Sequence, residues 1–166
     1  RVGDLPVVRD LLDGRHLEPD DVLVLLRPTA PFRRAAEISD VVDVLRTTGA
    51  DSVRSVLPAE SHPQKSYLQS GRIVVPSPVR SWPRLIPATD AHRANAPRQW
   101  LPPAWRAVGF IDAVRADVLV GLGSLEGDVI VGWPAPTDGR SVDIDTEADW
   151  ARAEALAVEK GWRPGE

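Results

Sequence analysis

A continuous apolar run at residues 22–26, Val-Leu-Val-Leu-Leu, is the feature that most constrains how this chain folds. Five apolar residues in succession leave no polar side for water, so the run is typical of a strand buried on both faces, as in a parallel sheet. Residues 4–12 and 34–47 carry apolar side chains at helical spacing, and residues 51–57 read as a second strand. Strands that alternate with helices predict an α/β fold with a mostly parallel sheet.

The composition is that of a globular protein, and it excludes several functions. Of the 166 residues, 43% are apolar and 27% are charged, which is typical of one soluble domain. The 20 lysines and arginines and 24 acids give a net charge of −4 without a basic block, so we expect no nucleic-acid partner. No apolar run reaches membrane-spanning length, so we expect no membrane association. The absence of cysteine excludes disulfides and thiolate metal sites, and we expect a cytoplasmic protein.

Residues 62–106 differ from the rest of the chain and predict an arm. They are rich in proline, arginine and tryptophan, and the prolines exclude long regular elements, leaving residues 73–75 as a short strand. Enrichment in aromatic residues and arginine is typical of interface cores. The arm is therefore either an interface or a surface flap whose tryptophans cover the core.

The chain after the arm predicts short strands and two helices. Residues 107–111 and 129–131 read as strands, the second at a sheet edge, and residues 112–120 read as a short helix. The last helix, at residues 147–160, is expected to turn Trp150 inward together with the neighbouring apolar residues on its face.

Residues 141–145, Ser-Val-Asp-Ile-Asp, have the pattern with the clearest chemistry. Their alternation predicts a strand that projects Asp143 and Asp145 from one face, and carboxylates so close repel each other unless a cation or water separates them. Such a pair suits Mg²⁺, which completes its shell with water and substrate phosphates. The alternative is a solvated strand end. Thr146 then reads as a helix N-cap, with Asp149 as the acid of a capping box.

The loop at residues 27–33 is a second candidate for a site. Its two prolines force an extended chain, and it follows the apolar strand directly. In open α/β sheets the carboxyl ends of strands line the ligand crevice. The alternative is a stiff connector.

The order of these motifs resembles one family, the acylneuraminate (sialic acid) cytidylyltransferases, which activate acidic keto-sugars. Residues 25–33, Leu-Leu-Arg-Pro-Thr-Ala-Pro-Phe-Arg, resemble the family's Leu-Gln-Pro-Thr-Ser-Pro-Leu-Arg loop. Residues 141–149, Ser-Val-Asp-Ile-Asp-Thr-Glu-Ala-Asp, resemble its closing motif. Further short stretches match in the family's order, at residues 50–56, 62–65, 98–99, 107–111 and 127–128.

The resemblance implies a three-layer, Rossmann-like nucleotidyltransferase. Such an enzyme uses CTP and Mg²⁺ to make a CMP-activated sugar acid and releases pyrophosphate. Asp143 and Asp145 would hold the metal, and Arg27 would join them as a catalytic residue beside the reacting groups. Five further residues share the role of binding the acidic keto-sugar: Lys65, Arg98, Gln99, Arg33 and Phe110.

The resemblance also implies a homodimer. Residues 1–166 would form one domain, whose arm at residues 62–106 reaches into the partner's site. The chain has no counterpart of the family's N-terminal strand and Ala-Arg-x-Gly-Ser-Lys loop, so we expect an N-terminal part of the domain to be missing. Arg27 replaces the loop's usual Gln, Ala30 replaces a Ser, and Phe110 stands near the usual Tyr. The alternative is a non-catalytic dimeric binding or assembly module that retains the fold without the nucleotide loop.

Overall fold

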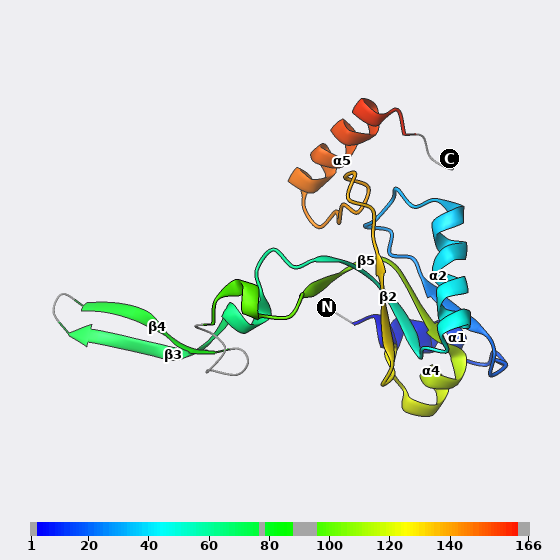
Figure 1. The fold of residues 1–166 in the computed structure, drawn as a ribbon, viewed down its shortest axis with the longest axis horizontal. Coiled ribbons are helices and arrows are strands. Elements are labelled where there is room, and N and C mark those ends of the chain that lie inside the picture. The colour runs from blue at the N-terminus through cyan, green and yellow to red at the C-terminus, as the bar shows by residue number, and fades with distance from the viewer. Residues whose placement is uncertain (1–2, 77–78, 88–95, 163–166) are drawn as a thin grey trace. The chain divides into compact units, whose positions relative to one another are not determined.

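The computed structural model describes residues 3–76, 79–87 and 96–162, which form two compact units (Figure 1). One unit comprises residues 1–57 with 107–166. The other comprises residues 58–106, close to the bounds of the predicted arm.

The first unit is built on a four-stranded sheet with the strand order β1-β5-β2-β6. The strands are β1 (Val22–Leu25), β2 (Ser52–Pro58), β5 (Trp105–Arg115) and β6 (Ile130–Pro134). β1 runs antiparallel to β5, and β2 runs parallel to β6. Hydrogen bonds join residue 51 to residue 115 and residue 55 to residues 110 and 111, so β2 and β5 run in opposite directions. The predicted α/β class is confirmed, but the prediction of a mostly parallel sheet is wrong, because β5 runs opposite to the other three strands and makes the sheet mixed.

The helices of this unit follow the local signals in the sequence. Within the described residues they are α1 (Asp4–Leu12), α2 (Ala35–Thr48), α4 (Ala116–Leu122) and α5 (Glu147–Lys160). Gly49 ends α2 with a φ of 66°, a left-handed conformation that glycine adopts without steric strain. The helices predicted at residues 4–12, 34–47 and 147–160 are confirmed.

The core lies between α2 and the sheet. Val41 and Leu45 of α2 pack with Val53 of β2 and with Phe110 and Ile111 of β5, and all five side chains are buried. Burying each such side chain stabilises the fold by about 1.5–3 kcal/mol, so this cluster supplies much of what holds the unit together.

The alternating side chains of β1 account for its continuous apolar run. Val22 and Val24 pack against the core cluster. Leu23 and Leu25 line a small cavity together with Val8 of α1. Because both sets are partly buried, apolar residues are needed at every position of the strand.

The second unit contradicts the prediction that prolines exclude long elements. β3 (Tyr67–Pro76) and β4 (Val79–Pro87) form an antiparallel two-stranded ribbon, and η1 (Pro63–Lys65) and η2 (Arg98–Trp100) are short 3₁₀ helices. In a two-stranded ribbon both strands are edges, so half of the N–H groups need no partner. Proline is tolerated at such positions.

Three further predictions are wrong. Residues 141–145 form a turn and irregular chain rather than a strand, because alternation alone supplies no neighbouring strand to pair with. Residues 112–115, predicted as the start of a helix, complete β5 by pairing with β1. Trp150 of α5 is 55% exposed, whereas Ala153 is the residue that this helix buries.

Two glycine substitutions test the helix end at Gly49. Gly49→Ala is expected to lower the free energy of unfolding by about 1 kcal/mol, because a Cβ is strained at a φ of 66°. Gly121→Ala, inside α4 with open space around the glycine, is expected to raise it by about 0.5–1 kcal/mol. Denaturant unfolding measures the free energy of unfolding of both variants, and equal shifts would contradict the left-handed conformation assigned to Gly49.

Candidate functional site

Two stretches that are far apart in the sequence meet in the first unit. The backbone N–H of Ile144 donates to the carbonyl oxygen of Thr29 at 2.9 Å. Thr29 belongs to the loop at residues 27–33, and Ile144 lies between Asp143 and Asp145. The proline loop and the carboxylate pair are therefore neighbours, although the predicted strand is absent.

Arg33 fixes the loop to β5. Its guanidinium donates to the carbonyl oxygen of Phe110 at 3.0 Å and to that of Arg27 at 2.5 Å. Burial lowers the pKa of the Arg33 guanidinium, and the positive charge of Arg27 lowers it further. These contacts give Arg33 a structural role, and its predicted role in binding the sugar stays a prediction.

Asp143 and Asp145 are exposed to solvent. No group of three His, Cys, Asp or Glu side chains that could hold a metal ion occurs among the described residues. Mg²⁺ needs only one or two protein carboxylates when water and substrate phosphates complete its shell. Two exposed carboxylates are therefore enough in number for a metal that is bound together with its substrate, although the strand expected to project them from one face is absent.

The chain after the carboxylate pair is fixed by the predicted capping box, which is confirmed. The Thr146 hydroxyl accepts from the Asp149 N–H at 3.2 Å, and the Asp149 carboxylate accepts from the Thr146 N–H at 3.0 Å. The hydrogen bond from the Thr146 hydroxyl lowers the pKa of Asp149, and backbone N–H groups at Thr146 and Asp145 add to this.

Arg140 anchors the chain before the pair. It is buried, and it donates to Asp138 at 2.9 Å and to Glu37 of α2 at 2.5 Å. Burial opposes its charge, but the hydrogen bonds and negative charges of Asp138 and Glu37 outweigh burial and raise the pKa of Arg140. The segment that leads to Asp143 is thus tied to α2.

A buried carboxylate, that of Asp112 on β5, lies at the centre of a second network. It is 4% exposed. Its Oδ2 pairs with the Arg27 guanidinium at 2.8 Å and with the Arg54 guanidinium at 3.2 Å. Its Oδ1 accepts from the Ser55 N–H at 3.1 Å and from the Ser55 hydroxyl at 3.3 Å. Such pairing is what a buried charge requires.

Ser55 carries the network into the backbone of β5. Its Oγ accepts from the N–H groups of Phe110 at 2.9 Å and of Ile111 at 3.0 Å. In a regular strand, successive N–H groups point in opposite directions. Gly109, with a φ of 60°, bends the strand so that both N–H groups reach one hydroxyl.

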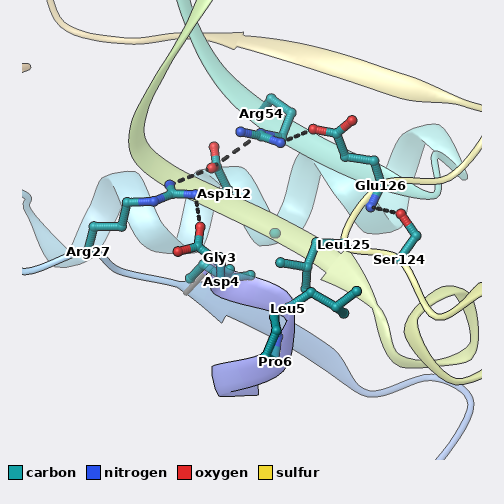
Figure 2. A pocket seen from close by; sticks show the side chains of 12 residues that line it. Gly3, Asp4, Leu5, Pro6, Arg27, Arg54, Asp112, Ser124, Leu125 and Glu126 are labelled. Carbon is teal, nitrogen blue, oxygen red and sulfur yellow. Dashed lines mark hydrogen bonds and ion pairs between the residues drawn. The ribbon is translucent and has the colours of Figure 1, made fainter. Parts of the chain in front are cut away.

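Figure 2 shows the pocket that opens beside Asp112. Its volume is about 360 Å³, and α1, β1, β2, β5 and the turn after α4 all contribute to its lining. Its charged residues alternate in sign: Asp4, Arg27, Asp112, Arg54 and Glu126. Of these five residues, only Arg27 is predicted from the sequence to be functional.

Arg27, the predicted catalytic arginine, is held between two acids. Besides Asp112 it pairs with Asp4 of α1 at 2.5 Å. Burial opposes its charge, but hydrogen bonds to Asp112 and Asp4 outweigh burial and raise the pKa of Arg27. A Cβ at Gly109 would lie 2.8 Å from its NH1, so this glycine leaves room for the guanidinium. Its catalytic role stays a prediction.

Three predicted sugar-binding residues belong to the second unit. Lys65 Nζ donates to the carbonyl oxygen of Ala96 at 2.8 Å, and Arg98 donates to that of Glu60 at 3.1 Å. Gln99 is exposed. Their binding role stays a prediction.

Phe110 lies within the core cluster, where its ring is 0% exposed. This burial gives Phe110 a role in core packing, and its predicted role in substrate binding stays a prediction. Asp112 is the functional candidate that the sequence analysis missed, and its signal was a lone acid inside the apolar stretch at residues 107–114.

No model of a protein family matches the chain. In the ranges that the structure describes, no helix combines the length and the apolar character needed to cross a membrane. The functional conclusion therefore depends on the motifs and on the geometry of these two networks.

Two buried serines on β2 test the Asp112 network. Ser55→Ala is expected to lower the free energy of unfolding by about 1–3 kcal/mol, because Asp112 and two backbone N–H groups lose a partner. Ser52 is equally buried, but its hydroxyl has no hydrogen-bond partner among the described residues. Ser52→Ala should leave stability unchanged or raise it slightly. Chemical denaturation measures the free energy of unfolding of both variants, and equal losses of stability would contradict the hydrogen-bond network around Asp112.

Proposed function

We propose that this chain acts as a cytidylyltransferase that transfers CMP from CTP to an acidic keto-sugar of the sialic acid type and releases pyrophosphate. The observation that carries the proposal is the hydrogen bond between Ile144 and Thr29. It joins the loop at residues 27–33 to the carboxylates of Asp143 and Asp145. These are the two motifs on which the family resemblance chiefly depends.

The carboxylate pair fits Mg²⁺ as a cofactor. Asp143 and Asp145 offer exposed, hard oxygen ligands on a segment that is fixed on both sides, by Arg140 before it and by the Thr146 cap after it. Mg²⁺ bound there would neutralise charge on the transferred phosphate and lower the pKa of the attacking hydroxyl. The protein's own contribution is positioning, which accounts for much of the catalysis in phosphoryl-type transfer.

Recognition of the sugar acid is assigned to Lys65 and Arg98, with Gln99 beside them. Arginine suits a carboxylate because its planar guanidinium offers parallel donors. Within the described residues each of the two cations donates to one backbone carbonyl, and an ammonium or a guanidinium carries further N–H donors. The proposal includes a Rossmann-like, three-layer domain and a homodimer formed through the arm at residues 62–106.

A non-catalytic dimeric module is the second candidate, and two observations favour it. Arg27 is held by Asp4 and Asp112, and Phe110 lies in the core. These two departures from the family pattern therefore serve the structure of the unit. This candidate predicts a dimer without metal-dependent chemistry.

Calorimetric titration of the chain with CTP, in Mg²⁺ and in EDTA, separates the two candidates. We expect binding that needs Mg²⁺ and weakens at least about tenfold in the double variant Asp143→Asn, Asp145→Asn, because both metal ligands lose their charge. Glu154→Gln, at an exposed acid of α5, is the matched control and should bind as the unchanged chain does. A coupled assay with a sialic-type acid then measures pyrophosphate release.

The opposite outcome is equally specific. CTP binding that ignores both Mg²⁺ and the double substitution, or no binding by the chain, would contradict the cytidylyltransferase proposal. A dimer in analytical ultracentrifugation under the same conditions would then support the assembly module.

A further inference from the structure

Two guanidiniums face the pocket of Figure 2 from either side of Asp112. Arg27 comes from the loop after β1, and Arg54 comes from β2. Asp112 is buried and pairs with both, so it orients the two cations. One buried negative charge thus holds two positive charges at the wall of a cavity.

The outer partners of the two arginines are held weakly. Asp4, at the start of α1, pairs with Arg27, and Glu126, in the turn after α4, pairs with Arg54. Their side chains are 46% and 48% exposed. An ion pair of this kind changes an equilibrium constant by about fivefold at most, so a competing anion displaces such a partner at little cost.

The guanidiniums have donors to offer. Arg54 donates from NH1 to Glu126, whereas its Nε lies 3.2 Å from the Asp112 Oδ2 as an ion pair and makes no hydrogen bond among the described residues. Arg27 uses one N–H on each of its two terminal nitrogens for Asp112 and Asp4. A guanidinium carries five N–H donors, so each arginine can bind an oxyanion without releasing Asp112.

The rest of the lining suits a small organic molecule. Leu5, Pro6, Leu25 and Leu125 supply apolar walls beside the charged residues. The volume of about 360 Å³ lies within the range of small-molecule sites. Apolar walls with a few convergent polar groups are the usual make-up of such sites.

We propose that this pocket binds an oxyanion, the carboxylate or phosphate group of a small molecule, between Arg27 and Arg54. The ligand replaces Asp4 and Glu126, which act as internal competitors for the same guanidiniums. Asp112 stays in place and keeps both arginines aligned. The inference depends on the pocket alone and stands apart from the carboxylate pair at Asp143 and Asp145.

Removing an internal competitor should strengthen binding, which no purely structural role of these acids predicts. The full chain, freed of divalent metal on a chelating resin, is titrated at low salt with inorganic phosphate and, separately, with a sialic-type sugar acid, followed by calorimetry and by NMR. Asp4→Asn and Glu126→Gln are each expected to tighten binding by up to about fivefold. The probe that binds more tightly shows whether the pocket takes phosphate or carboxylate.

A matched control separates the pocket from a general effect of charge. Asp10→Asn removes one negative charge from the same helix, α1, at an exposed residue outside the pocket lining, and should leave binding unchanged. The proposal is overturned if neither probe binds, or if all three variants change affinity equally. No divalent metal is present in this titration, so a lack of phosphate or sugar-acid binding does not bear on the cytidylyltransferase proposal. Likewise, a lack of Mg²⁺-dependent CTP binding does not bear on the proposed oxyanion pocket.

Discussion

The first unit depends on how the carboxylate of Asp112 is paired. A buried charge that loses its partner costs about 3–5 kcal/mol, so the chain has to bring cations and donors to this point of β5. Arg27 arrives from the end of β1, and Arg54 and Ser55 arrive from β2. The strand order β1-β5-β2 places β5 between the two strands that supply these groups. The mixed sheet therefore places the partners of the buried carboxylate beside it.

The loop at residues 27–33 connects the Asp112 network to the candidate metal site. Arg27 is fixed by Asp112, Arg33 is fixed by the backbone of β5, and Thr29 between them accepts the hydrogen bond from Ile144. The segment with the two carboxylates is consequently held by this loop as well as by Arg140 and the Thr146 cap, and it needs no strand pairing. That is why the segment can carry exposed acids on irregular chain and still have a defined place.

The sequence predicted those parts whose signals are local. The caps and periodicity of α2 and α5 lie within the helices themselves, so both were predicted. The apolar run of β1 predicted a strand, but β1 is a partly buried, antiparallel edge strand rather than one buried on both faces in a parallel sheet. The ribbon of β3 and β4 was missed because proline is excluded only where a strand has neighbours on both sides. The strand at residues 141–145 was predicted from alternation, but strands need a partner that alternation does not reveal. Asp112 was missed because its cations lie 58 and 85 residues away in the sequence.

The two proposed sites have opposite electrostatic preferences, yet they share one loop. Asp143 and Asp145 attract a cation, whereas Arg27 and Arg54 attract an oxyanion. Thr29 contacts the first segment, and Arg27, two residues before it, belongs to the second network. A substrate that carries both a metal-bound phosphate and a free carboxylate or phosphate matches this pair of preferences. The proposed oxyanion preference on that side of the loop depends on the charge of Arg27, which Asp112 and Asp4 balance inside the protein.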